Sequence, residues 1–299
     1  MAKVAFIGLG VMGFPMAGHL KTKGGHDVTV YNRTAEKAAA WAEKFSGKSA
    51  STPAEAAAGA DFVFVCVGND EDLRSVTLGE NGALHGMKPG SVLIDNTTAS
   101  AEVARELYAA AKEKGVDFID APVSGGEKGA KDAVLSIMVG GDARDVEEAR
   151  PLLETVGKTV VHVGGSGSGQ TVKAANQLIV ATNIQALAEA VVFLKAYDVD
   201  LESALEVLGG GLAGSAVLNQ KKQNMVNGSF EPGFRIDLHH KDTGIVTSAA
   251  REAGVVVPVA ALVAQLMASA RANGDGGLDH SALLKGVERL SGRSEESSS

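Results

Sequence analysis

Short runs of β-branched and aromatic residues alternate with longer Ala-rich segments through residues 1–163. The apolar runs are nearly continuous, as expected for strands that are buried on both faces of a sheet. The segments between them carry apolar residues at the spacing of one helix face. We predict strands at Val4–Ile7, Val28–Tyr31, Phe62–Val67, Val92–Asp95, Phe118–Ala121, Leu135–Val139 and Val160–Val163. We predict helices at Val11–Lys23, Ala35–Phe45, Ala101–Lys114 and Ala143–Val156.

Beyond about residue 164 the strand pattern ends and only helical patterns follow, at 169–197, 200–210, 214–227, 238–254, 258–273 and 280–291. Residues 1–163 are therefore expected to form an α/β domain with a Rossmann-type, doubly wound and mainly parallel sheet. Residues 164–291 are expected to form an all-α C-terminal domain. The polar, low-complexity residues 292–299 are expected to be a disordered tail.

The predicted helix at 169–197 is apolar or small on nearly every side. A helix without a polar face is usually buried on several sides. We therefore expect it to join the two domains and to pack against a second subunit, in a homodimer or homotetramer.

The amino-acid composition and net charge exclude some classes of binding partner. The chain is 45% hydrophobic and 21% charged, with a net charge of −8, which argues against nucleic acid and anionic membrane surfaces. Any anionic ligand must therefore be held by a local positive site. Cys66 is the only cysteine, and the apolar stretches at 178–194 and 255–270 are interrupted by polar residues or proline. We expect a cytoplasmic protein without a membrane span.

A glycine-rich motif lies directly between the first predicted strand and the first predicted helix. Gly8 permits a tight turn, Gly10 lets the backbone approach a pyrophosphate, and Gly13 allows close packing of helix on strand. Free N–H groups and the helix dipole then favour the negative charge. The alternative is a glycine-rich turn without a ligand. The predicted dinucleotide site comprises Gly8-Leu9-Gly10-Val11-Met12-Gly13.

The residue that discriminates between cofactors is expected at the end of the second strand. An acidic side chain about 20 residues beyond the motif binds the ribose 2′-hydroxyl of NAD. This chain has Asn32-Arg33-Thr34 there instead. Because no carboxylate repels a 2′-phosphate and an arginine can bind it, we predict NADP(H) as the preferred cofactor, with NAD(H) possible. Otherwise Arg33 is an ordinary surface arginine.

The third and fourth predicted strands end on the same edge of the sheet, where dinucleotides lie in such folds. Val67 and Thr98 follow these strands, and Thr98 is a candidate contact of the nicotinamide ribose. Cys66, beside Val67, is interpreted as a small core residue.

Ser124-Gly125-Gly126 follow a further strand and offer a hydroxyl and unobstructed backbone N–H groups. They make a candidate cradle for a small carboxylate, although an ordinary turn has the same composition.

Lys173 lies in GGSGSGQTVKAANQ, where a glycine-rich turn leads into the long helix. Asn176 and Gln177 follow it on the same helix face, and Asn183 extends this polar strip. Most lysines are solvated, but one that is partly buried in a cleft has a lowered pKa and can donate a proton near neutral pH. Lys173 is therefore the candidate proton donor, with Asn176 and Gln177 as substrate ligands.

Four ordered motifs, GLGVMGFPMAGHL, DAPVSGG, GGSGSGQTVKAANQ and FRIDLHHKD, resemble those of the β-hydroxyacid dehydrogenases. This resemblance covers residues 2–291. Within the family, segments such as KAANQLIVATNIQALAEA and NGDGGLDHSALL are most similar to the tartronate semialdehyde reductases (2-hydroxy-3-oxopropionate reductases).

The resemblance implies roles for individual residues. Lys173 matches the catalytic lysine, and Asn176 matches the asparagine that orients the substrate. Ser124–Gly126 match the cradle of the substrate carboxylate. Lys241 matches a lysine near the cofactor, and Asp242 is expected to position it. The implied reaction transfers a hydride from NADPH to the aldehyde carbon of a small anionic semialdehyde while Lys173 protonates the oxygen, giving the 3-hydroxy acid.

Two positions depart from the family pattern. His19 stands where many members have asparagine, and Thr243 replaces the usual leucine after Lys-Asp.

Several alternatives use the same residues. A 3-hydroxyisobutyrate dehydrogenase or a broad glyoxylate and succinic semialdehyde reductase needs the same site, whereas Gln177 favours a hydroxylated substrate such as tartronate semialdehyde. A decarboxylating 6-phosphogluconate dehydrogenase needs a longer helical domain, and an imine reductase or a non-catalytic cofactor-binding scaffold is expected to lack Lys173. No ligand spacing typical of a metal site occurs among His239, His240, Asp279 and His280, and no metal is expected.

Overall fold

A computed structural model describes residues 1–293, and most of the predicted tail, residues 294–299, lies outside the described residues. The chain forms two compact units, Met1–Lys173 and Ala174–Ser299, here called the N-terminal and C-terminal units. The division falls inside helix α8 (Ser168–Ala196), whereas the boundary expected near residue 164 lies at the end of strand β9 (Gly157–Gly164).

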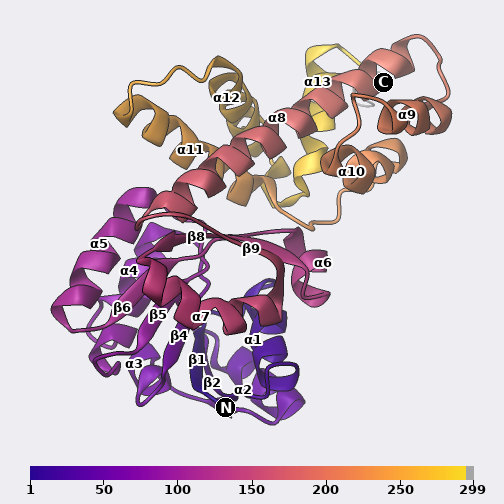
Figure 1. Ribbon diagram of the computed structural model, residues 1–299. Coiled ribbons are helices and arrows are strands. Elements are labelled where there is room, and N and C mark those ends of the chain that lie inside the picture. The colour runs from indigo at the N-terminus through magenta and orange to yellow at the C-terminus, as the bar shows by residue number, and fades with distance from the viewer. Residues whose placement is uncertain (294–299) are drawn as a thin grey trace. The chain divides into compact units, whose positions relative to one another are not determined.

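The N-terminal unit is built on a nine-stranded sheet (Figure 1). The strand order is β3-β2-β1-β4-β5-β6-β8-β7, with β9 paired to β8. Strands β1 to β6 run parallel, β8 is antiparallel to β6 and β7, and β9 is parallel to β8. The other strands are β1 (Lys3–Ile7), β2 (Asp27–Tyr31), β3 (Lys48–Ser49), β4 (Phe62–Val65), β5 (Val92–Asp95), β6 (Asp117–Asp120), β7 (Val123–Ser124) and β8 (Leu135–Gly141).

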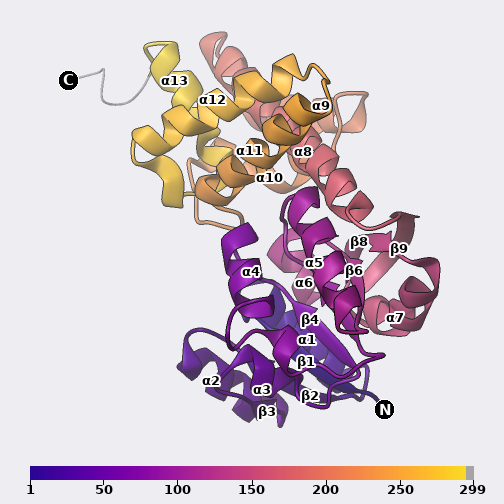
Figure 2. The same ribbon diagram turned by 90° about the vertical axis from the view of Figure 1, so that its left-hand side faces the viewer.

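Helices cover both faces of this sheet, because successive strand residues point to opposite sides. Phe6 packs in the core with α1 (Gly13–Thr22), α2 (Ala35–Phe45) and α7 (Ala143–Val156). Its neighbour Ile7 packs in a second core on the opposite face. The helices over that face, seen in Figure 2, are α3 (Pro53–Ala57), α4 (Asp70–Thr77) and α5 (Ala101–Glu113). The predicted doubly wound, mainly parallel sheet is confirmed.

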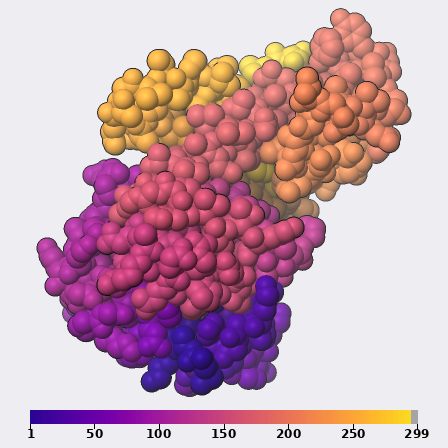
Figure 3. All heavy atoms as spheres, in the orientation of Figure 1, coloured from indigo at the N-terminus to yellow at the C-terminus, as the bar shows by residue number. Residues whose placement is uncertain are grey.

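Short elements are the ones that the sequence pattern did not predict. Strands β3 and β7 contain two residues each, and α3, α4 and α6 (Gly126–Lys131) are also short, so none of them is long enough for its apolar spacing to identify it. The strand predicted to reach Val67 ends at Val65, and the helix predicted from Val11 begins at Gly13. In Figure 3, α7 and β9 form much of the near face of the N-terminal unit.

The C-terminal unit contains only helices and turns in its described part, apart from one isolated bridge between Arg235 and Asp279. Its core takes Ile184 and Leu187 from α8 and Met267 from α12. Side chains cap the starts of α-helices in this unit, because Asp200 accepts from Ser203 N–H and Ser215 accepts from Leu218 N–H. Beyond α8 the helices are α9 (Leu201–Gly210), α10 (Ala216–Asn227), α11 (Ile236–Glu252), α12 (Pro258–Ala272) and α13 (Leu283–Leu290).

Helix α8 is, among residues 1–293, the one helix long and apolar enough to cross a membrane by length and composition. Its most apolar 18-residue window is 44% buried inside the protein, and Ile184, Leu187 and Val191 belong to the core. The central helix of a soluble protein has these same properties.

Candidate active site

Glycine is present for different structural reasons at the three glycine positions of the first turn. Gly8 has φ +97°, and a Cβ there would lie 2.2 Å from the carbonyl oxygen of Cys66. A Cβ on Gly13 would lie 2.0 Å from the carbonyl oxygen of Gly8. A Cβ on Gly10 would meet no atom within 4 Å. Packing therefore requires glycine at Gly8 and Gly13 but not at Gly10, whose bare backbone fits the close approach of a dinucleotide pyrophosphate.

The start of α1 is suited to an anion. The N-cap residue Met12 makes no side-chain hydrogen bond to the helix start, and none of the described residues in the first turn of this helix is acidic. Val11 is exposed and Leu9 is buried beside the turn. A helix start of this kind offers its N–H groups and positive dipole end to a phosphate.

Asn32 holds the end of β2 against the glycine-rich turn. Its Oδ1 accepts from Leu9 N–H at 2.9 Å, and its Nδ2 donates to the Thr34 carbonyl at 3.0 Å. The Arg33 side chain is 87% exposed, and its Nη1 lies 3.5 Å from Asp72 Oδ1. Such an exposed pair is weak, so Arg33 can exchange this partner for a phosphate. Asp72 was not predicted from the sequence, because its proximity to Arg33 depends on how α4 packs.

The loops that follow β4 and β5 are joined by a hydrogen bond. Val67 N–H donates to the buried hydroxyl of Thr97 at 3.1 Å. Thr98, the candidate contact of the nicotinamide ribose, is the next residue and is half-buried. Both predicted cofactor contacts therefore belong to one hydrogen-bonded pair of loops.

The candidate carboxylate cradle has a backbone that only glycine adopts readily. Ser124 ends β7 and pairs with Ser136 of β8. Gly125 has φ +136° and Gly126 has φ +66°, although a Cβ on Gly126 would meet no atom within 4 Å. Backbone conformation, not crowding, accounts for glycine at Gly126. Binding of a carboxylate here stays a prediction.

Lys173 lies in the second turn of α8, and its side chain is only 6% exposed. The helix start is held by a buried carboxylate from the end of β6. Asp120 Oδ1 accepts from Gly167 N–H at 2.7 Å, and its Oδ2 accepts from Gln170 N–H at 2.9 Å. Burial raises the pKa of Asp120, although these N–H groups favour its charged form.

Gln170 is a buried residue that was not predicted from the sequence. Its Nε2 donates to the Thr97 carbonyl at 2.7 Å and lies 3.3 Å from Asp95 Oδ2. Its Oε1 accepts from Ala99 N–H at 3.1 Å. Burial raises the pKa of Asp95 to about 7. A signal existed in the sequence, since Asp95 ends one predicted strand and Asp120 lies one residue before the end of another, but their partner was not evident.

In the C-terminal unit, the predicted residues form a chain of contacts. Asn176 Nδ2 donates to Gln177 Oε1 at 2.8 Å, and Gln177 Nε2 donates to Asp242 Oδ2. Lys241 Nζ lies 3.0 Å from Asp242 Oδ1. Asp242 is thus in place to hold both Gln177 and Lys241, while their roles in binding stay predictions.

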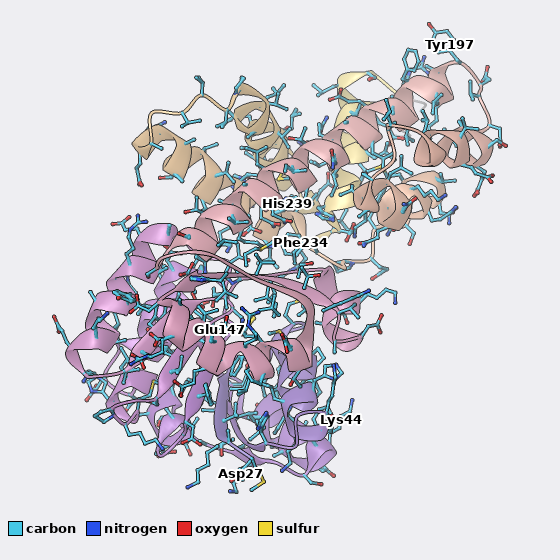
Figure 4. The ribbon with its side chains drawn as sticks, in the orientation of Figure 1. Asp27, Lys44, Glu147, Tyr197, Phe234 and His239 are labelled. Carbon is cyan, nitrogen blue, oxygen red and sulfur yellow. The ribbon has the colours of Figure 1, made fainter. Side chains whose placement is uncertain are left out.

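Two buried histidines of the same unit lie next to this chain of contacts. His239 and His280 approach each other at 3.0 Å between their Nδ1 atoms, and His239 lies close to Phe234 (Figure 4). Burial lowers the pKa of His280 well below its usual value. Among residues 1–293, no group of three or more His, Cys, Asp or Glu side chains is arranged to hold a metal ion.

The chain matches two family models that together cover almost its whole length. Residues 3–164 match the NAD-binding domain of 6-phosphogluconate dehydrogenase, and residues 167–287 match the NAD-binding domain of NADP-dependent 3-hydroxyisobutyrate dehydrogenase.

Three similar proteins are informative. An uncharacterised oxidoreductase of Shewanella frigidimarina is 47% identical over 289 residues, covering 97% of this chain and 99% of the relative. The 2-hydroxy-3-oxopropionate reductase of Escherichia coli is 37% identical over 290 residues, covering 96% and 98%. The structure of Mycobacterium tuberculosis 3-hydroxyisobutyrate dehydrogenase with L-serine has a TM-score of 0.86 and 32% identity, covering 95% and 98%.

The resemblance seen in the sequence is confirmed by these matches along both units. The chain belongs to the β-hydroxyacid dehydrogenase (3-hydroxyisobutyrate dehydrogenase) family and is an NAD(P)-dependent oxidoreductase that acts on CH–OH groups.

Proposed function

We propose that this enzyme interconverts a small carboxylate-bearing semialdehyde and its 3-hydroxy acid, with tartronate semialdehyde and glycerate as the substrate pair. The burial of Lys173 carries the proposal, since a lysine is almost never buried unless it has a partner or a function. The choice of substrate rests on the four sequence motifs and on the similarity to the 2-hydroxy-3-oxopropionate reductase of Escherichia coli.

Bound NADPH supplies the hydride that adds to the aldehyde carbon. Lys173 donates a hydrogen bond from Nζ to the carbonyl oxygen and transfers a proton to it as the alkoxide forms. In the reverse direction, the neutral amine accepts the proton of the hydroxyl group. Ser124 and the N–H groups of Gly125 and Gly126 bind the substrate carboxylate, which fixes the carbonyl for attack. By the family resemblance, Asn176 orients the substrate, and Gln177, which lies beside it on the helix face, is a further candidate substrate ligand.

The proposed cofactor preference is for NADP(H). Asn32 replaces the acidic residue that selects NAD, and its side chain is occupied with the backbone of Leu9 and Thr34. Arg33 is exposed beside it and forms a long ion pair with Asp72. The family model matched by residues 167–287 describes an NADP-dependent enzyme, which supports the same choice.

A steady-state panel tests this function. Tartronate semialdehyde, methylmalonate semialdehyde, glyoxylate and succinic semialdehyde are each measured with NADPH and NADH. We expect the highest kcat/KM for tartronate semialdehyde with NADPH. Equal kcat/KM values across the panel contradict the proposed substrate, and a clear preference for NADH contradicts the proposed cofactor. The highest value with methylmalonate semialdehyde identifies a 3-hydroxyisobutyrate dehydrogenase instead.

The proposed assembly is a homodimer or homotetramer in the cytoplasm. Helix α8 exposes an apolar strip in which Ile179 and Phe193 are more than half exposed, and the rings of Tyr197 and Phe193 are tilted against each other with their centroids 5.0 Å apart. Figure 4 shows Tyr197 projecting from the end of this helix. A second copy of the chain is the proposed cover for this strip.

A further inference from the structure

Gln170 meets four groups at the ends of the neighbouring strands β5 and β6 within the N-terminal unit. Its side-chain amide donates to the Thr97 carbonyl, accepts from Ala99 N–H and lies near Asp95 Oδ2. Its backbone N–H donates to Asp120. The residue is 1% exposed, so these hydrogen bonds replace water rather than compete with it.

These contacts tie α8 to the loop after β5. Thr97 and Ala99 lie on either side of Thr98, the predicted contact of the nicotinamide ribose. The hydroxyl of Thr97 also accepts from Val67 N–H in the loop after β4. Gln170 therefore joins the helix to both loops that are predicted to hold the nicotinamide end of the cofactor.

Lys173 follows Gln170 by three residues and lies on the same side of α8. With its first turn bound to Asp120 through the N–H groups of Gly167 and Gln170, the helix can neither rotate nor slide without breaking buried hydrogen bonds. The direction of the Lys173 side chain is thereby linked to the loop at Thr98.

We propose that Gln170 is a positioning residue that fixes the Lys173 amine relative to the nicotinamide site. This inference rests on the proposed role of Lys173 as proton donor. An amide suits the position, because it donates to Thr97 and accepts from Ala99 at once, and it adds no charge beside Asp95 and Asp120.

The variant Gln170→Glu keeps the volume and shape of the side chain and removes its amide N–H donor, so it tests the hydrogen bonds separately from the packing. Its ionised carboxylate cannot donate to the Thr97 carbonyl and is repelled by Asp95 and Asp120. Protonation of the new carboxyl group restores a donor. We therefore expect its activity relative to wild type to be lowest at high pH and to recover as the pH falls.

The test compares Gln170→Ala and Gln170→Glu with Gln185→Ala, which removes another buried glutamine of α8, whose side-chain amide donates to Glu189 in the same helix. A misplacement of about 1 Å costs roughly 100-fold in rate, so kcat should fall about 10- to 100-fold in Gln170→Ala. The kinetic isotope effect with 4-deuterated NADPH should rise, while the Kd for NADPH changes less than about threefold. In the cofactor-free enzyme, amide hydrogen exchange of residues 166–172 should accelerate. Gln185→Ala should leave all four measurements unchanged.

The results that contradict the positioning role differ from those that contradict the proposed function. Wild-type kcat and isotope effect in Gln170→Ala, with activity lost in Lys173→Ala, overturn the positioning role and leave the proposed function intact. Full activity in Lys173→Ala contradicts the proposed function itself. A pH-independent loss in Gln170→Glu also overturns the inference, and this variant remains decisive if Gln170→Ala does not fold.

Discussion

Asp95 and Asp120 end adjacent parallel strands and lie directly opposite each other in the register of β5 and β6. Both carboxyl groups are fully buried. Burial disfavours the charged form of each, and the charge of one raises the pKa of the other. Backbone N–H groups hold both carboxyl groups in place. Thr97 N–H donates to Asp95, and the N–H groups of Gly167 and Gln170 donate to Asp120.

The raised pKa of Asp95 makes stability depend on pH. In the folded protein Asp95 binds a proton up to a pH of about 7, whereas the unfolded chain releases it near 3.8. Between these values the folded state holds more protons, so its stability falls as the pH rises, by roughly 4 kcal/mol at most. Asp95→Asn should flatten this decline in urea unfolding measured from pH 4 to pH 8. An equally steep decline in the variant contradicts the assignment to Asp95.

Replacement of Lys173 tests the proton donor. Lys173→Ala should lower kcat by at least about 100-fold because no other group then protonates the alkoxide. The Kd for NADPH should stay within a fewfold, since the predicted cofactor contacts lie elsewhere. Lys195→Ala, which removes an exposed lysine of the same helix that pairs with Glu288, is the matched control and should keep full activity. Activity that survives in Lys173→Ala disproves the assignment.

Replacement of Arg33 tests cofactor choice. Loss of a charge-assisted bond to the 2′-phosphate costs about 1.5–3 kcal/mol, so Arg33→Ala should raise KM for NADPH by roughly 10- to 100-fold. KM for NADH should change little. Arg74→Ala removes an arginine of the same unit that pairs with Glu106, and it should alter neither value. An equal rise of both KM values in Arg33→Ala contradicts a 2′-phosphate contact.

At the scale of elements, the turn between β1 and α1 shows how one motif combines packing and binding. A methyl group at Gly13 would strike the Gly8 carbonyl, and one at Gly10 would enter open space. Helix, strand and turn are therefore held together by Gly8 and Gly13, while Gly10 is left for the ligand.

This difference predicts that replacement by alanine has different effects at Gly13 and at Gly10. Gly13→Ala should lower Tm by several degrees or prevent folding, because backbone must move to admit the new atom. Gly10→Ala should leave Tm within about 2 °C and weaken NADPH binding at least about 10-fold, since the methyl group occupies the space of the pyrophosphate. Thermal unfolding measures the Tm of each variant, and titration with NADPH measures its Kd for the cofactor. Undiminished binding in Gly10→Ala contradicts the proposed cofactor site.

Element length explains which helices and strands were predictable. Helix α2 and strand β5 have the predicted bounds, because each contains a full apolar repeat between turn residues. Strand β7 and helix α6 contain too few residues for such a repeat, so the pattern could not reveal them. They nevertheless carry Ser124 and Gly126 of the candidate carboxylate cradle.

At the scale of the whole molecule, the exposed apolar strip of α8 predicts self-association. Phe193 is 62% exposed, and a carboxylate in its place would be desolvated in an interface between two copies. Phe193→Asp should therefore shift the protein to a smaller species in sedimentation equilibrium. Leu290→Asp, at the end of α13, tests another exposed apolar side chain and should leave the mass unchanged. A wild-type protein that is monomeric at micromolar concentration refutes the proposed assembly.

The sequence by itself determined the fold class, the family and the candidate catalytic lysine. Periodic apolar residues specify buried faces locally, and the glycine-rich and lysine-containing motifs are contiguous in the chain. Only the tertiary structure revealed the partners of that lysine's helix. Asp95, Asp120 and Gln170 are far apart in sequence, and they meet because parallel strands end at one edge of the sheet. Burial then decided which of their polar groups must be hydrogen-bonded, and no local pattern encodes burial of this kind.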